Sequence, residues 1–236
     1  MSSKTGSKTV YAHHSFLFLA ILAALLIPLI ALVFFGAISV AFESVGFTPV
    51  TILLLLAATL IGSFINIPVG KLKANAPVVR EESVSWLGIT YRIPHVEYGE
   101  TATTVAVNVG GALIPTGVCM YLLIKSAPSM ILLSLIGVLA VAIVTHLVAR
   151  PVKGVGITTP FFIPPIAAAV AAVILSPAHP ITIAYVSGVL GTLIGADLWN
   201  LRKVPELGAP VASIGGAGTF DGVFLTGIVA VLLAGL

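Results

Sequence analysis

Apolar residues in this chain gather in seven long runs that short polar or helix-breaking segments separate. A helix needs about 20 mostly apolar residues to cross the hydrocarbon core of a bilayer, with a range of about 17–25. The runs that meet this requirement are 16–42, 50–69, 101–124, 129–149, 160–176, 181–200 and 217–236. The pattern therefore predicts an all-α integral membrane protein with seven transmembrane helices. The first run is longer than the h-region of a cleavable signal, so we expect it to be retained.

One sizeable polar stretch, 70–100, lies between the second and third runs. Val, Ile, Trp and Tyr interleave there with polar residues, and Leu87-Gly88 separates two such segments. This pattern is typical of a short β-hairpin. Because an isolated hairpin is only marginally stable, we expect it to pack on the membrane domain. The prediction is one transmembrane domain over 1–236, with 70–100 as a small cytoplasmic insertion.

The composition excludes a soluble globular domain. Hydrophobic residues make up 58% of the 236 residues and charged residues only 8%, whereas soluble domains carry about 25% charge. The mean hydropathy is +1.18, and a chain with so little charge is not expected to bind nucleic acid. The single cysteine, Cys119, has no partner for a disulfide or a thiolate metal site. We expect no metal and no cofactor.

The distribution of lysine and arginine predicts the orientation, because cytoplasmic loops carry the excess of these residues. With the N-terminus inside, ten of the eleven basic residues fall on the cytoplasmic side: Lys4, Lys8, Lys71, Lys73, Arg80, Arg92, Arg150, Lys153, Arg202 and Lys203. Lys125 falls in an outer loop. The sequence thus predicts a multi-pass protein of the cell membrane with its C-terminus outside.

Two acidic residues lie inside predicted spans, Asp197 in "GTLIGADLWN" and Asp221 in "GTFDGVFLTG". Ionisable residues at such positions are costly and are functional candidates by default. The sixth run ends on the cytoplasmic side soon after Asp197, and the seventh begins there just before Asp221. Consecutive antiparallel helices are normally neighbours, so we expect the two carboxylates at similar depth on adjacent helices.

A pair of carboxylates in a low-dielectric site can share one proton and activate a water for attack on a peptide carbonyl. This is the chemistry of aspartic proteases, and it needs no metal or nucleophilic side chain. Other hydrolase signatures are missing from the sequence, which has neither H-E-x-x-H nor G-x-S-x-G. The five histidines are scattered without ligand spacing.

Around these two aspartates the chain resembles the GxGD-type intramembrane aspartyl proteases, the presenilin and signal peptide peptidase group. In that group the first catalytic aspartate lies in a span entering the cytoplasm, and the second follows in the next span within Gly-x-Gly-Asp. The resemblance covers 195–222 and implies that Asp197 and Asp221 are catalytic, with Gly218 as the first motif glycine. Phe220 replaces the second glycine, and Ala196 stands where the group usually has tyrosine.

Two further comparisons complete the resemblance. The GxGD group has nine spans and a Pro-Ala-Leu motif in the last, and the best counterpart here is "TTPFFIPP" in the fifth run. The phrases "FINIP", "NVGGALIP", "TPFFIPP" and "GGAGTFDG" also resemble an uncharacterised family of prokaryotic membrane proteins, which implies a prokaryotic plasma membrane.

The protease hypothesis also predicts where a transmembrane peptide or protein substrate binds. Glycines before Asp221 would keep the backbone extended and accessible, so that an unwound substrate pairs with it, and the hairpin would add strand pairing. The predicted substrate-binding residues are Gly215, Gly216, Gly218, Thr219, Phe220, Gly222, Thr158, Thr159 and Pro160.

Two other interpretations fit the same residues. Helix breakers in "FINIPVG", "NVGGALIPTG" and "GITTPFFIPP", together with membrane aspartates, are parts that proton- or sodium-coupled secondary transporters use. In the simpler alternative, Asp197 pairs with Arg202 or Lys203 at the interface and Asp221 caps the start of the seventh helix.

Overall fold

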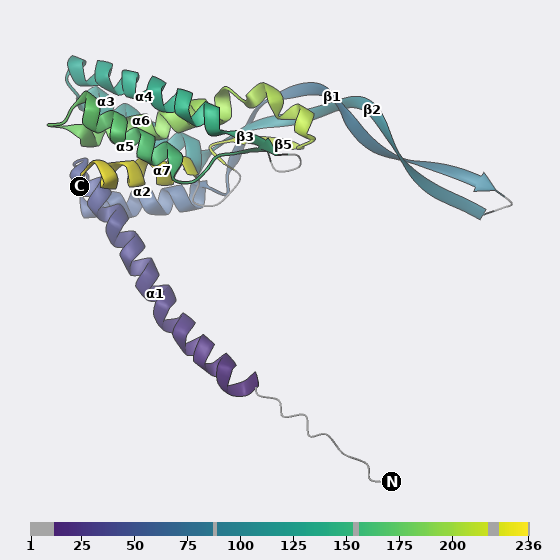
Figure 1. Cartoon of the computed structure of the whole chain (residues 1–236), viewed down its shortest axis with the longest axis horizontal. Coiled ribbons are helices and arrows are strands. Elements are labelled where there is room, and N and C mark those ends of the chain that lie inside the picture. Colours follow the sequence, from purple (N-terminus) through teal and green to yellow (C-terminus); the bar gives the residue numbers. More distant parts are fainter. Residues whose placement is uncertain (1–11, 87–88, 153–155, 217–221, 236) are drawn as a thin grey trace, which may run out of the picture. The chain divides into compact units, whose positions relative to one another are not determined.

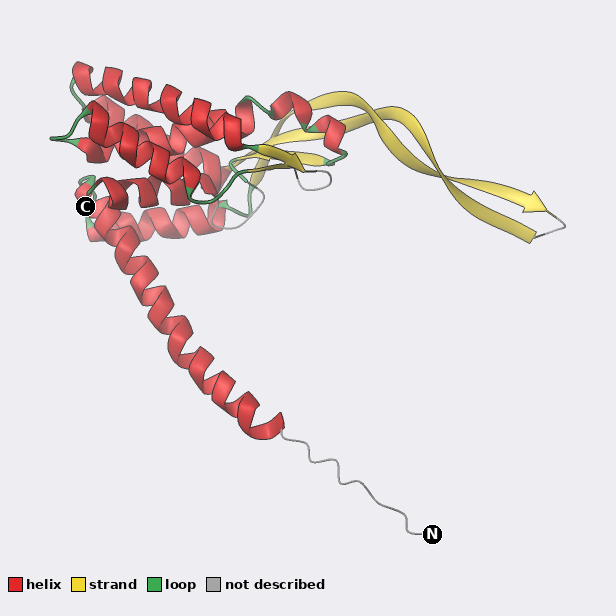
Figure 2. Ribbon diagram, viewed as in Figure 1, coloured by secondary structure: helices red, strands yellow, loops and turns green. Residues whose placement is uncertain are grey.

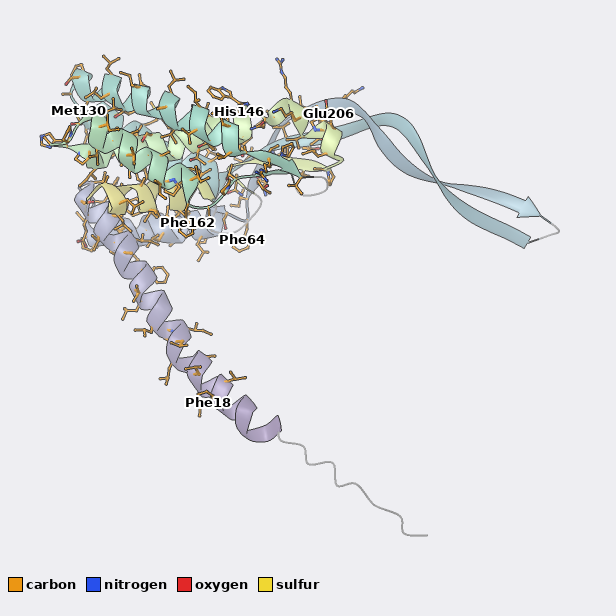
Figure 3. All side chains as sticks on the ribbon, viewed as in Figure 1. Phe18, Phe64, Met130, His146, Phe162 and Glu206 are labelled. Atoms are coloured by element: carbon orange, nitrogen blue, oxygen red, sulfur yellow. The ribbon has the colours of Figure 1, made fainter. Side chains whose placement is uncertain are left out.

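A computed structural model describes residues 12–86, 89–152, 156–216 and 222–235. The chain divides into two units, Met1–Val40 and Ala41–Leu236. The described part of the first unit belongs to helix α1 (Ala12–Ser44), whose side chains include many exposed apolar ones such as Phe18 and Leu25 (Figure 3). An α-helix that is apolar on every side suits a hydrocarbon environment.

The second unit is built around a bundle of helices (Figure 1). These are α2 (Pro49–Gly62), α3 (Ile114–Lys125), α4 (Pro128–Val148), α5 (Ile163–Leu175), α6 (Pro180–Thr192) and α7 (Gly222–Ala234). π-Helical turns extend two of them, η1 (Val109–Leu113) before α3 and η2 (Leu193–Leu198) after α6. Helix α6 contacts α3, α4, α5 and α7, and its residues 183–189 are all buried. It therefore forms the centre of the bundle.

Small residues allow the helices around α6 to approach closely. A Cβ on Gly191 of α6 would lie 2.7 Å from Val141 Cβ of α4, and one on Gly227 of α7 would lie 2.6 Å from Val189 Cγ2 of α6. Such contacts are typical of membrane helix packing, in which small side chains let the backbones come together. Proline in the first turn begins α2, α3, α4, α5 and α6, where its missing N–H leaves no bond unmade.

The predicted hairpin is present and is longer than expected. Strands β1 (Asn66–Trp86) and β2 (Ile89–Asn108) pair antiparallel, from Asn66 opposite Asn108 to Trp86 opposite Ile89, with one irregularity at Pro68/Gly70. We call this pair the ribbon; it extends from one end of the bundle (Figure 2). Leu87 and Gly88 lie outside the described residues, and the pairing of Trp86 with Ile89 gives the link the predicted two-residue length.

The helical prediction is wrong at the ribbon's inner end. Residues 66–69 and 101–108, which were assigned to the second and third spans, form strand. The apolar run Val105, Ala106, Val107 suits a buried strand as well as a helix, and periodicity alone does not separate the two over such a length. The strand ends at Asn108, whose Oδ1 accepts the N–H of Gly111 at 2.7 Å and so caps η1.

Further strands at this end of the bundle also correct the all-α prediction. Strand β5 (Val211–Ile214) pairs parallel with β2, with Thr104 opposite Val211, and gives a three-stranded sheet of order β1-β2-β5. Strands β3 (Arg150–Val152) and β4 (Gly156–Thr158) form a separate antiparallel pair. The short 3-10 turns η3 (Leu201–Lys203) and η4 (Pro205–Leu207) connect η2 to β5.

Two helical segments among the described residues are long and apolar enough to cross a membrane, Pro128–Val148 and Pro180–Lys203. The broken pair Phe35–Ser44 and Pro49–Gly62 would add a third span. Shorter apolar helices cover Val109–Lys125, Ile163–Leu175 and Gly222–Ala234. The chain is thus mostly helical, with a small sheet and two or three helical segments of membrane-spanning length in its described part. An α-helix occupies part of each predicted run, but several are shorter than predicted.

Shortening the ribbon tests whether its distal part is needed for the fold. Ala76 pairs with Gly99, so an Asn-Gly turn in place of residues 77–98 can close the strands there. We expect the melting temperature of the purified chain to change by less than about 4 °C, or roughly 1 kcal/mol. The bonds that tie β2 to the β5 segment, Thr104 N–H to Pro210 O and Thr103 Oγ1 to Ala209 O, remain.

The control is Thr104→Pro in the full chain, which removes the N–H that Pro210 O accepts at 3.0 Å. This variant is expected to melt at a clearly lower temperature. If the shortened chain aggregates while Thr104→Pro melts normally, the ribbon rather than the β2–β5 junction stabilises the unit.

Candidate functional site

Asp197 lies at the end of the central helix, in the π-helical segment η2. Its side chain is half-buried, and its Oδ2 accepts a hydrogen bond from the backbone N–H of Gly215 at 2.7 Å. Gly215 directly follows β5, so one carboxylate oxygen is fixed on the end of that strand. Lys203, one of the two cations considered as its partner, donates from Nζ to Asn200 Oδ1 at 2.9 Å.

Asp197 lines a cavity of about 190 Å³ at the end of the bundle. The walls come from five parts of the chain: β4 with Thr159, the end of α6 with η2, η3 with Val204, β5 with Gly216, and the start of α7. The lining residues are Gly156, Ile157, Thr159, Thr192, Ala196, Asp197, Leu201, Val204, Val211, Ala212, Ser213, Ile214, Gly216, Gly222 and Val223. A half-buried carboxylate and residues of two different strands therefore line the same cavity.

Among the described strands, β5 lies at one edge of the three-stranded sheet. In a parallel ladder, successive residues turn their N–H and C=O groups to opposite sides. Thr104 N–H donates to Pro210 O, so Pro210, Ala212 and Ile214 face β2. Val211 and Ser213 then face the open side, and Gly215, next in that series, directs its N–H to Asp197. The open edge of β5 and the carboxylate lie on the same side of the strand.

A polar network holds the C-terminal end of β5. The Ser213 hydroxyl, which has one hydrogen to donate, contacts two acceptors, Asn66 Oδ1 at 2.6 Å and Gly216 O. Asn66 Oδ1 accepts from Asn108 Nδ2 at 3.2 Å, and this amide also donates to Ser63 O at 2.8 Å. The end of β5 is thus connected to the first residue of β1 and the last residue of β2.

The expectation that Gly215 and Gly216 keep the backbone extended is wrong. Both have positive φ, +81° and +90°, and form the turn that ends β5. Gly215 is buried, and a Cβ there would lie 2.6 Å from Ala112 Cβ and Ala112 N. Glycine is required at this position for its conformation and for close packing. The extended backbone lies one step earlier, at Val211–Ile214.

Replacing Gly215 by Ala separates these two requirements. We expect the free energy of unfolding to fall by about 3 kcal/mol, because a left-handed conformation costs about 1 kcal/mol and overpacking adds about 1–3. The matched control is Gly208→Ala, which has φ +73° but no heavy atom within 4 Å of the added Cβ. Denaturation of both variants in detergent is the measurement. Equal losses would show that Gly215 is not packed against Ala112.

Only one of the three site residues predicted in "TTPFFIPP" lines the cavity. Thr159 lines the cavity, whereas Thr158 and Pro160 are not among its described lining residues. Thr158 ends β4, is exposed, and donates from Oγ1 to Arg150 O at 3.2 Å. Helix α5 begins at Ile163, so these three residues precede the helix that was predicted to contain Pro160. Gly156, the first residue of β4, has φ +114°, which lies outside the α-helical region.

Four of the remaining predicted site residues belong to the segment 217–221, which the structure does not describe. Gly218, Thr219, Phe220 and Asp221 lie outside the described residues. The residues on both sides of this segment, Gly216 and Gly222, line the same cavity as Asp197. Asp221 is bonded to Gly222, the first residue of α7.

Sequence reasoning missed β4, β5 and Thr192 as parts of this site. The sequence signal for β5 is weak, because the four-residue stretch "VASI" is short and does not alternate strictly between apolar and polar residues. Its partner strand lies about a hundred positions earlier, at Thr104–Val107. No local sequence feature predicts that pairing.

A family model matches residues 60–233, and its description is "Protein of unknown function (DUF1614)". The match begins in α2 and ends in α7, so it covers the ribbon, the central bundle and the whole cavity. Comparison with curated proteins and with solved structures found no match.

Proposed function

We propose that this chain, which belongs to the DUF1614 family, is an intramembrane aspartyl protease-like enzyme that hydrolyses peptide bonds of membrane-spanning substrates. The observation that carries the proposal is the cavity in which Asp197 meets the open edge of β5 and Gly222, the neighbour of Asp221. A carboxylate next to a strand edge that pairs with no other described strand provides both a catalytic group and a means of holding an extended peptide.

In this reaction Asp197 and Asp221 share one proton. The ionised carboxylate takes a proton from a water whose oxygen attacks the peptide carbonyl carbon, while the protonated carboxyl gives its proton to the carbonyl oxygen. The tetrahedral gem-diol then collapses: the C–N bond breaks, the protonated carboxyl of the dyad gives its proton to the leaving amine, and the other carboxylate takes a proton from a hydroxyl of the intermediate, so that the dyad again holds one proton. The Gly215 N–H on Asp197 Oδ2 supports this scheme, because it fixes the orientation of the carboxylate.

Strand addition would place the scissile bond. The N–H groups of Val211 and Ser213 face the open side of β5, and β4 contributes Gly156 and Ile157 to the lining of the same cavity. An extended substrate segment between β5 and β4 would pair with the first strand and bring its backbone to Asp197. A membrane helix must unwind to adopt this form, which exposes its carbonyls to attack.

The finer topology belongs to the same proposal: seven spans, N-terminus inside, C-terminus outside, in a prokaryotic cell membrane. Its support is the position of charge along the described elements. Lys71 and Lys73 lie on β1, Arg150 on β3, and Arg202 and Lys203 on η3, and the strands lie at one end of the bundle (Figure 1). Lys125 ends α3, at the far end of that helix from η1. This asymmetry fits a cytoplasmic cavity mouth.

The test is cleavage of single-span peptides by the purified protein in liposomes. Peptides with a fluorophore and quencher on either side of the span report hydrolysis, and mass spectrometry identifies the cut bond. We expect cleavage near the cytoplasmic end of the span, at acidic to neutral pH. No cleavage of any peptide in a panel of varied spans over this pH range would contradict the proposal.

A second candidate function is a proton- or sodium-coupled transporter, and the observation that favours it is the pair of π-helical breaks, η1 and η2. Solute flux and peptide cleavage, measured in the same liposomes, distinguish the two candidate functions. Proton- or sodium-dependent solute flux that Asp197→Asn abolishes, without peptide cleavage, would favour the transporter.

A further inference from the structure

The direction in which Asp197 points depends on the π-helical form of η2. Trp199 N–H donates to Ile194 O, five residues earlier, at 2.9 Å. Relative to an α-helix this turn contains one additional residue, which rotates the residues after it by about 100°. π-Helical turns are rare and are found frequently at functional sites. The support for η2 therefore bears on the position of the carboxylate.

Asn200 provides that support from the C-terminal side. Its side chain is buried, with 1% of its surface exposed. Its Nδ2 lies 3.1 Å from Gly195 O and 3.0 Å from Ala196 O, the carbonyls of the two residues before Asp197. Carbonyls at the end of a helix have no partner within the helix. The Asn200 amide supplies one, and its Oδ1 accepts from Lys203 Nζ at 2.9 Å.

Helix α4 holds the same turn from the other side. A Cβ on Gly195 would lie 2.3 Å from Ala142 O, so the backbones of η2 and α4 are in contact there. His146, near the end of α4, has its Nδ1 3.1 Å from Asn200 Nδ2 and 3.3 Å from Gly195 O (Figure 3). Its ring meets Trp199 edge-on, with centroids 5.5 Å apart. Asn200 thus joins η2 to α4.

We propose that Asn200 is a positioning residue for Asp197. By bonding Gly195 O and Ala196 O, its amide keeps η2 in the π-helical form that directs the carboxylate onto Gly215 N–H and into the cavity. This geometric role stands apart from the reaction. The catalytic consequence, that Asn200 sets the orientation of an acid–base group, rests on the proposed function.

The test compares variants that remove the two N–H donors with one that leaves them. Asn200→Leu and Asn200→Asp have similar size and lack both donors, and Asn200→Asp keeps an oxygen for Lys203. Lys203→Gln is the control, because it removes only the contact to Oδ1. The readout is the rate at which a water-soluble carbodiimide modifies Asp197, measured by mass spectrometry relative to the exposed Glu206 in the same sample.

We expect both Asn200 variants to raise the relative modification rate of Asp197 at least 3-fold, because Oδ2 leaves Gly215 N–H and becomes open to the reagent. In the Lys203→Gln variant, Asp197 is expected to be modified at the wild-type rate. In the cleavage assay, the Asn200 variants should lower kcat with KM unchanged.

If Asp197 is modified at the wild-type rate in both folded Asn200 variants, the proposal is wrong. It is also wrong if neither variant folds, since Asn200 would then be structural only. If the wild-type chain cleaves no peptide, the proposed function fails, and the modification rates still decide the role of Asn200.

Discussion

Replacing Asp197 by Asn is expected to lower the rate of peptide cleavage by about 10³-fold, within the 10²–10⁴ that acid–base groups contribute. The amide has the same size, and its oxygen can still accept the Gly215 N–H that Asp197 Oδ2 now accepts at 2.7 Å. It cannot exchange the proton that the reaction requires. The same loss is expected for Asp221→Asn, and the double variant should be no slower than either single one, because the two carboxylates act as a unit.

The matched control is Glu206→Gln, an exposed carboxylate on η4 that does not line the cavity. It removes the same charge and should cleave at the wild-type rate. The melting temperature of each variant is measured in detergent, and cleavage rates are compared among variants that melt at the wild-type temperature. Substantial cleavage by Asp197→Asn would place the catalytic group elsewhere.

Replacing Val211 by Pro is expected to lower kcat/KM for peptide cleavage by about 10-fold or more. Val211 N–H faces the open side of β5, so its removal breaks no bond to β2 and deletes a donor that a substrate strand would use. A hydrogen bond contributes about 0.5–1.5 kcal/mol, and the proline ring also obstructs a pairing strand. Half of the Val211 surface is exposed, 52%, so the ring has room.

The control for this change is Val211→Ala, which shortens the side chain and keeps the N–H. We expect it to cleave within about 2-fold of wild type, a difference of less than 0.5 kcal/mol. If Val211→Pro also cleaves at that rate, or if both variants lose activity equally, the substrate does not pair with β5 through this residue.

Much of the helical core could be predicted from apolar run length alone. Helix α4 (Pro128–Val148) agrees closely with the predicted 129–149, and α5 lies within 160–176. Run length does not predict the structure of an apolar segment that meets a non-local partner. Val105 and Val107 pair with Ala212 and Ile214, and this pairing makes strand of a segment that reads as helix.

The candidate site could likewise be predicted only in part from the sequence. Asp197 could be singled out because a carboxylate in an apolar run is costly, and the glycines after β5 because they cluster. The sequence did not indicate that Gly215 is buried with positive φ, or that η2 is π-helical. Both follow from tertiary contacts, Gly215 with Ala112 and Gly195 with Ala142. Asn200 and His146 were not predicted as parts of the site for the same reason.

The proximity of Asp197 and Asp221 can be measured directly by cross-linking. In a Cys119→Ala background, which removes the chain's single cysteine, Asp197→Cys and Asp221→Cys are combined. A bifunctional thiol reagent is chosen whose span matches the separation of about 4–7 Å that a proton-sharing pair requires. Leu198→Cys with Asp221→Cys is the control pair, since Leu198 is exposed and does not line the cavity. We predict efficient intramolecular cross-linking of the 197/221 pair and little of the 198/221 pair; no cross-link between 197 and 221, with each cysteine reacting with a monofunctional reagent, would contradict the dyad.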